Sequence, residues 1–167
     1  MSLQYGSVKI PPPTATPLKR GQQLNTITSQ EVVNELEKKL LIFYANFLGM
    51  VAEDQSQFDV AINYYKKAWE MYEKFCDWYW ASQTLGKWGR VLEAQENYAQ
   101  ALPIYIRALA IEQEHNQDLI CYYINALARM LKQLGESQFQ VIWRDATGEE
   151  CAGEVREVIW TARDELG

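Results

Sequence analysis

Apolar residues recur every three or four positions from about residue 28 onward, a spacing that places them on one side of an α-helix. The first such stretch runs to about residue 55. Its apolar residues are Leu36, Leu40, Phe43, Phe47 and Met50. The pattern therefore predicts a long amphipathic helix at the start of the folded region.

Helix starts are marked by side chains that can accept a hydrogen bond from a free backbone amide. Thr28 and Glu31 have the spacing of a capping box, with Ile27 and Val32 placed as a hydrophobic staple. Later helices follow Ser56, Asp77, Asn97 and Asp118, and we expect them over 57–75, 78–95, 98–115 and 119–134. Strand-like alternation does not separate these stretches, so the sequence predicts an all-α fold.

A last helix is predicted over 148–166, because Thr147 and Glu150 repeat the capping-box spacing. One side of this helix is apolar and the other is charged. The apolar residues are Val155, Val158, Ile159, Ala162 and Leu166. A stack of helices must seal its last exposed face, so we expect residues 147–167 to cap the C-terminal end. A helix that binds a partner is the alternative.

The sequence also repeats itself at one fixed interval. The identical pairs are Gly49/Gly89, Val51/Val91, Glu53/Glu93, Gln55/Gln95, Ala61/Ala101, Tyr65/Tyr105 and Ala68/Ala108. Self-similarity at this period indicates stacked helical units that bury their faces against one another. The small residues would let helices approach closely, and the tyrosines would fill the space between them.

The repeated residues resemble the tetratricopeptide repeat (TPR), in the longer-period form found in kinesin light chains and bacterial signalling proteins. They are "FLG" with F-x-x-A-x-x-x-Y-x-x-A in 47–68, and "KWG" with Y-x-x-A-x-x-x-Y-x-x-A in 87–108. A third unit starts at Asp118 and keeps "ALARMLKQLG" at 126–135, but its second helix, "SQFQVIWRDA", departs from the pattern. The resemblance covers about 42–146. It implies a right-handed superhelical solenoid of antiparallel helix hairpins, with two clear repeats, one degenerate repeat and a C-terminal capping helix.

The resemblance further implies that the first helices of successive units line a concave groove. That groove would capture a peptide segment of another protein. The resemblance also implies its candidate binding residues, and helical spacing supports the grouping, because residues three, four and seven apart share a face. They are Asn46, Met50, Lys87, Arg90, Tyr122, Asn125, Arg129 and Lys132.

Two features of this set favour a peptide. Asn46 and Asn125 occupy equivalent places, and an Asn amide can bond both the N–H and the C=O of an extended backbone. The four cations favour an acidic segment, since arginine binds carboxylates with two parallel hydrogen bonds. The alternative is a solvated charged face, in which Glu93 pairs with Arg90 three residues away.

The predicted function is therefore a protein–protein interaction module. A structural module is the alternative, one that packs on a neighbouring domain or forms a homodimer with a second copy and takes no peptide. The stretch "FCDWYWASQ" at 75–83 is relevant to the interaction module and to the structural module. Adjacent aromatic residues in it cannot all point inward from one helix. We expect at least one of them on the surface.

Residues 1–26 differ from the rest of the chain. The segment "KIPPPTATPLKRG" at 9–21 holds four of the five prolines and should be extended, largely as polyproline II. We therefore divide the chain into a Pro-rich leader or linker (1–26), TPR-like repeats (27–146) and the capping helix (147–167).

Charge and composition exclude several classes of function. A net charge of −6 argues against general binding to nucleic acid or anionic membranes, which needs basic surface. The longest apolar run, 40–52, contains Asn46 and is too short to span a bilayer. Without a signal-peptide pattern, and with three scattered cysteines, we expect a cytoplasmic protein with reduced thiols.

Catalytic patterns are absent from the sequence. His115 is the only histidine, and no Ser/His/Asp or Cys/His arrangement can be drawn. The glycines of "GKWGR" at 86–90 lie inside a predicted helix and are expected to serve packing rather than phosphate binding. We therefore expect no enzyme activity, no cofactor and no metal site.

Overall fold

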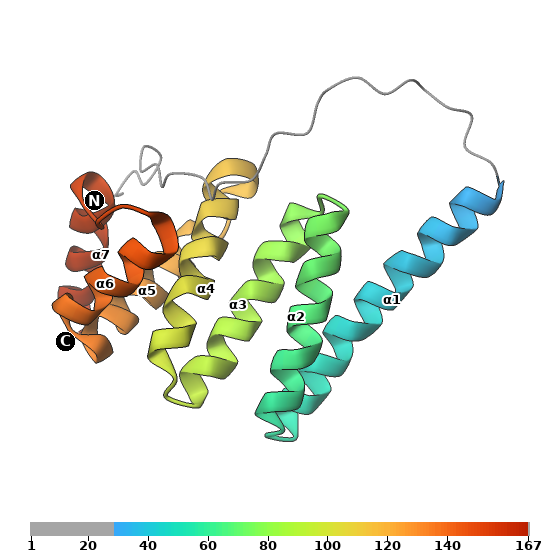
Figure 1. The fold of residues 1–167 in the computed structure, drawn as a ribbon, viewed down its shortest axis with the longest axis horizontal. Coiled ribbons are helices and arrows are strands. Elements are labelled where there is room, and N and C mark those ends of the chain that lie inside the picture. Colours follow the sequence, from blue (N-terminus) through green and yellow to red (C-terminus); the bar gives the residue numbers. More distant parts are fainter. Residues whose placement is uncertain (1–28, 167) are drawn as a thin grey trace.

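The computed structural model describes residues 29–166, and within that range the chain forms seven α-helices, one π-helical turn and no strand (Figure 1). The helices are α1 (Ser29–Asp54), α2 (Phe58–Lys74), α3 (Trp78–Ala94), α4 (Tyr98–Ile111), α5 (Ile120–Leu134), α6 (Glu136–Thr147) and α7 (Gly153–Glu165). The π-helical turn η1 (Glu112–Asn116) directly follows α4. The predicted all-α class is confirmed for this range. The Pro-rich leader over 1–26 and the capping residue Thr28 lie outside it.

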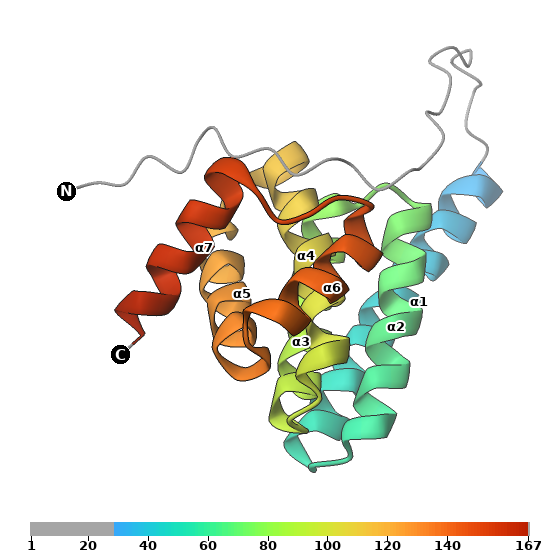
Figure 2. The ribbon, with the colours of Figure 1, turned by 60° about the vertical axis from the view of Figure 1, so that its left-hand side comes forward.

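Each helix packs against the next one along the chain from α1 to α5. Helix α6 contacts α4 and α5, and α7 contacts α5. Both views place α1 at one end of this row of helices and α7 at the other (Figures 1 and 2). The first turns of α1 extend beyond α2, and residues 30–41 are all exposed.

The core contains the glycine, alanine and tyrosine positions that recur in the sequence repeat. Tyr65 and Tyr105 are fully buried. A Cβ atom added to Gly49 would lie 2.6 Å from the Tyr65 ring, and one added to Gly89 would lie 2.6 Å from the Tyr105 ring. The predicted packing role of both glycines is therefore confirmed, because any larger residue would overlap a tyrosine.

Three similar turns end α1, α2 and α3. Their central residues, Ser56, Cys76 and Glu96, have φ of 58°, 56° and 57°. The amide that follows each of them donates to the carbonyl five residues earlier. These bonds are Gln57 N to Ala52 O (2.8 Å), Asp77 N to Tyr72 O (2.9 Å) and Asn97 N to Leu92 O (2.8 Å). This is the Schellman pattern of a helix C-terminus.

The expected helix starts are confirmed only in part. The Asp77 side chain accepts from Trp80 N at the start of α3, at 3.5 Å, and α4 begins directly after Asn97. Ser56 was expected to cap α2, but this is wrong, because Ser56 is the left-handed residue that ends α1. Asp118 does not flank α5 either, since that helix begins at Ile120.

The capping box predicted at residues 147–150 is also wrong. Thr147 is the last residue of α6, and Gly148 follows it with φ of 83°. The Thr147 hydroxyl donates to the Trp143 carbonyl at 2.9 Å, inside α6. Helix α7 therefore begins only at Gly153.

The apolar side of α7 covers α5, as its sequence pattern predicts. Ile159 and Ala162 are buried, while Leu166 stays exposed. Trp160 lies edge-on against the buried Phe139 of α6, with ring centroids 5.5 Å apart. The charged residues of α7 remain on the outside, so this helix closes the end of the row.

Candidate partner-binding face

The surface formed by α1, α3 and α5 carries most of the predicted binding residues, and we call it the partner-binding face. The opposite sides of α3 and α5 are buried, which leaves the predicted residues of both helices exposed or half-buried. The predicted residues at the surface are Met50 on α1, Lys87 and Arg90 on α3, and Tyr122, Asn125, Arg129 and Lys132 on α5. Seven of the eight predicted residues thus reach the surface, and their role in binding stays a prediction.

Asn46 is the exception. It is only 4% exposed, and its side-chain amide is already bonded. The Asn46 Nδ2 donates to Thr84 Oγ1 at 3.0 Å, and its Oδ1 accepts from Lys87 Nζ at 3.0 Å. The predicted peptide-binding role of Asn46 is wrong in this structure, because α3 covers the side chain and supplies both of its partners.

The two arginines of the face are paired with glutamates of the preceding unit. Arg90 donates from Nε to Glu53 Oε1 at 2.9 Å, and Tyr65 donates its hydroxyl to Glu53 Oε2 at 2.7 Å. The carboxylate of Glu53 on α1 thus links a side chain of α2 to a side chain of α3. The alternative considered in the sequence analysis paired Arg90 with Glu93, whereas the structure pairs it with Glu53.

The same arrangement recurs one unit later. Arg129 donates to both carboxylate oxygens of Glu93, from Nε at 2.6 Å and from Nη2 at 3.1 Å. Tyr105 donates to the same carboxylate at 2.9 Å. We call the two sets Tyr65–Glu53–Arg90 and Tyr105–Glu93–Arg129 the Glu–Arg ladder. It is the clearest expression of the sequence repeat in the contacts.

The ladder changes the electrostatics of the face. Burial alone would lower the pKa of Arg90, but the hydrogen bond and charge of Glu53 raise it. The pKa of Arg129 is also raised, and the largest cause is the hydrogen bond that Arg129 donates to Glu93. Both guanidiniums are therefore held charged against carboxylates, and the expected cluster of four available cations is reduced.

Lys87 has a different environment. Its ammonium donates to two neutral acceptors, Asn46 Oδ1 at 3.0 Å and Met50 Sδ at 3.4 Å. Burial lowers the pKa of Lys87, and the nearby Arg90 lowers it further, while Glu53 opposes both. Unlike Arg90 and Arg129, Lys87 therefore donates to acceptors that carry no charge.

Exposed aromatic residues border the face. Tyr79 and Trp80 are both exposed, so the expectation that the 75–83 stretch reaches the surface is confirmed. Tyr122 is also exposed and lies edge-on against the buried Tyr123, with ring centroids 5.1 Å apart. Aromatic rings of this kind contribute much of the energy in protein interfaces.

The largest group of exposed apolar side chains lies on α1, and the sequence analysis did not identify it. Nine of the fifteen exposed large apolar side chains in the described residues belong to this helix. They are Val32, Val33, Leu36, Leu40, Leu41, Phe43, Tyr44, Phe47 and Met50. The regular spacing in the sequence predicted an apolar side of α1 but not that it would stay uncovered.

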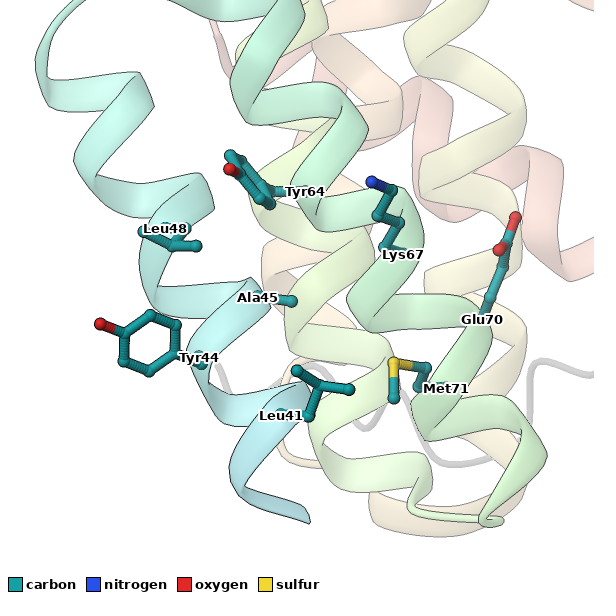
Figure 3. Close-up of a pocket in the computed structure, with 8 residues that line it drawn as sticks. All are labelled: Leu41, Tyr44, Ala45, Leu48, Tyr64, Lys67, Glu70 and Met71. Carbon is teal, nitrogen blue, oxygen red and sulfur yellow. The ribbon is translucent and has the colours of Figure 1, made fainter. Parts of the chain in front are cut away.

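A cavity of about 390 Å³ lies between α1 and α2 (Figure 3). Its lining is mostly apolar. The residues are Leu41, Tyr44, Ala45 and Leu48 of α1 and Tyr64, Lys67, Glu70 and Met71 of α2. Its two charged residues, Lys67 and Glu70, both belong to α2.

Two titratable groups outside this face, His115 and Glu112, have structural partners. The His115 ring stacks on Trp78 with centroids 4.8 Å apart and an interplanar angle of 5°. The buried Glu112 accepts from Ser82 Oγ at 2.5 Å and from Leu119 N at 3.0 Å, which holds the turn between α4 and α5. Glu112 therefore closes a loop.

Two further searches give negative results for the described range. Between residues 29 and 166, His, Cys, Asp and Glu side chains do not gather in groups of three suited to a metal ion. None of the helices in the same range combines the length and apolarity needed to cross a bilayer. Comparison with known proteins found no matching family model, no matching curated protein and no matching solved structure.

Proposed function

We propose that this chain is a TPR-type interaction module, a right-handed solenoid of antiparallel helix hairpins that binds a segment of another protein. Support comes from contacts that recur with the sequence repeat. The Glu–Arg ladder joins α1 to α3 and α3 to α5 through equivalent residues. Glycine–tyrosine packing joins the helices within each of the first two units.

Lys87 carries the proposal for the binding site. Its ammonium lies on the partner-binding face with only neutral hydrogen-bond acceptors, next to the exposed Met50 and Arg90. A carboxylate from an extended acidic segment would supply the missing counter-charge. Tyr122 and Asn125 on α5 would contact the neighbouring part of that segment.

The ladder also makes the face rigid before binding. Glu53 and Glu93 fix the guanidiniums of Arg90 and Arg129 across neighbouring helices. A face whose side chains are already ordered loses less conformational entropy when a ligand binds. We therefore expect recognition centred on one carboxylate at Lys87, with apolar contacts beside it, rather than on four cations at once.

An immobilised array of short peptides that differ in net charge and apolar content would test this proposal. We expect the chain to bind peptides that combine Asp or Glu with apolar residues. Lys87→Glu should weaken that binding by about tenfold to hundredfold, the usual effect of losing a charged hydrogen bond. Lys66→Glu, an exposed lysine on α2, is the matched control and should bind as the original chain does.

Circular dichroism would first establish that both variants are folded. Equal binding by Lys87→Glu and Lys66→Glu, or no preference for acidic peptides, would contradict the proposed site. The second candidate function is the structural one, in which the repeats pack on a second copy of the chain. The exposed apolar residues of α1 favour it, and they carry the inference that follows.

A further inference from the structure

One stripe of α1 has the spacing of a coiled-coil interface. Its members follow one another at intervals of three, four, three, four and three residues. They are Val33, Leu36, Leu40, Phe43, Phe47 and Met50, and we call them the α1 seam. Alternating intervals of three and four keep apolar residues facing one partner helix, in the a and d positions of a heptad repeat.

The α1 seam is uncovered along its whole length. Exposed fractions of its six side chains range from 42% for Met50 to 66% for Leu40. Its N-terminal half lies on the part of α1 that extends beyond α2 (Figures 1 and 2). Contiguous apolar surface of this kind marks an interaction site in a soluble protein.

The spacing of the seam specifies a helix as its occupant. Each of the described helices α2–α7 carries at most two exposed large apolar side chains. The helix with a matching, uncovered heptad stripe is α1 itself, in a second copy.

We propose that the chain forms a two-fold symmetric dimer in which the α1 seams of two copies pack antiparallel. One register satisfies all six positions at once. Val33 would then face Met50 of the partner subunit, Leu36 would face Phe47 of the partner subunit, and Leu40 would face Phe43 of the partner subunit. Two-fold symmetry repeats these three contacts, as an interface of one surface with itself requires.

Side-chain size favours this antiparallel register. It sets the aliphatic half of the seam against the half that carries Phe43, Phe47 and Met50, so that small and large residues interdigitate. A parallel register would instead oppose each residue to its own copy.

The seam is long enough for a helix–helix interface. From Val33 to Met50 it extends about 27 Å along the helix. Val32 and Tyr44, both exposed beside the seam, add to the apolar surface that the second copy would cover.

The dimer does not depend on the peptide-binding proposal. Lys87, Tyr122 and Asn125 lie on α3 and α5, and only Met50 belongs to both surfaces. The two proposals can therefore fail separately. Tyr122→Ala, on α5 and outside the seam, should weaken peptide binding and leave the dimer intact.

Sedimentation equilibrium of the full chain, over micromolar concentrations, tests the dimer with two neighbouring leucines. Leu40 belongs to the seam, whereas Leu41 lies beside it and lines the cavity of Figure 3. The original chain and Leu41→Glu should both be dimers. Leu40→Glu should raise the dimer dissociation constant by about 100-fold or more, because it places two charges in an apolar interface.

The solvent exposure of both leucines makes it possible to change them without unfolding the chain, and circular dichroism would verify this. A monomeric original chain overturns the proposal. So does an equal loss of dimer in Leu41→Glu, which would move the contact to the cavity side of α1.

Engineered disulfides distinguish the orientations. Cys76 and Cys121 are exposed and would first be replaced by serine, while the buried Cys151 remains. Under mild oxidation, a mixture of Leu36→Cys and Phe47→Cys chains should form the disulfide that joins one of each. Cross-linking of Leu36→Cys chains to one another would instead indicate parallel helices and overturn the register.

Discussion

Ser56, Cys76 and Glu96 adopt a left-handed backbone conformation that glycine normally provides. They are evenly spaced along the chain, once after each of the first three helices. A side chain in this conformation crowds the following carbonyl at a cost of roughly 1 kcal/mol. Each turn therefore holds some strain, which the Schellman hydrogen bonds and the packing of the helices offset.

Replacing Glu96 with glycine should relieve that strain. We expect Glu96→Gly to raise the free energy of unfolding by about 0.5–1 kcal/mol, because glycine adopts positive φ without a Cβ clash. Ala94→Gly, two residues earlier and still in α3, is the matched control and should lower it by a similar amount. Urea denaturation measures both, and a destabilised Glu96→Gly would contradict the interpretation.

Some residue roles were predictable from spacing and others were not. Gly49 and Gly89 were identified because each recurs with a tyrosine at a fixed distance. Asn46 was misassigned because its burial depends on Thr84 and Lys87, which lie far along the chain on α3. Periodicity gives the face of a helix that a residue occupies, but not what another helix places over it.

At the scale of elements, the Glu–Arg ladder is the main polar link between units. Each glutamate accepts from a buried tyrosine of the next helix and from an arginine one unit further on. Sequence spacing suggested the wrong partner for Arg90, since Glu93 is closer along the chain but Glu53 is closer in space. The correct pairing follows only when neighbouring helices are set side by side.

A double-mutant cycle on Arg129 and Glu93 measures the ladder. Arg129→Met combined with Glu93→Gln should give a coupling free energy of about 1 kcal/mol, because both groups are partly shielded from water. The pair Arg144–Glu150, in which both side chains are more than half exposed, is the control. Its coupling should be within about 0.5 kcal/mol of zero. Equal coupling in the two pairs would mean that the ladder contributes no more than a surface ion pair.

Helix α7 illustrates why the start of the last helix was mispredicted. Thr147 and Glu150 do have capping-box spacing, but Gly148 between them allows a left-handed turn that ends α6. The Thr147 hydroxyl donates back into α6, and although its oxygen accepts from Glu149 N, no helix begins there. The apolar side of α7 was predictable all the same, because Ile159 and Ala162 keep helical spacing.

At the scale of the whole molecule, buried tyrosine and cysteine side chains make the free energy of unfolding fall at alkaline pH. Burial, the largest cause in each case, raises the pKa of Tyr65, Tyr105 and Tyr123 above the ordinary value, and it raises the pKa of Cys151 to about 12. Unfolded thiols and phenols ionise near about pH 8.5 and 10. These groups therefore stay protonated in the folded chain at pH values where the unfolded chain has lost the proton.

The sign of the pH effect follows from this difference. Stability is complete below about pH 8.5, falls as Cys151 ionises in the unfolded chain, and falls faster above about pH 10 as the tyrosines do so. Lys87, with its lowered pKa, opposes this trend. Urea midpoints between pH 7 and 11 would measure it, and Cys151→Ala should remove the loss between pH 8.5 and 10. A midpoint that stays constant to pH 11 would contradict the prediction.

Most of the architecture could be predicted from patterns along the chain. Helix positions, the sequence repeat and the exposed sides of α3 and α5 all depend on the spacing of residue types. The uncovered seam on α1 could not be predicted, because exposure depends on whether another helix covers Leu36 and Leu40. Charge pairing depends likewise on distances between helices.

The Glu–Arg ladder has translational symmetry, so the chain could be lengthened by whole units. A duplicate of residues 57–96, inserted after residue 96, would bring a second Tyr65 to Glu93 and a second Arg90 to the same carboxylate. The duplicate's own Glu93 would then meet Tyr105 and Arg129 unchanged. Some contacts would not carry over, because the copied Thr84 and Lys87 would face Gly86 and Arg90 where the originals face Asn46 and Met50. Lengthening by tandem duplication thus needs few compensating substitutions, and the size of the face could change without a new fold.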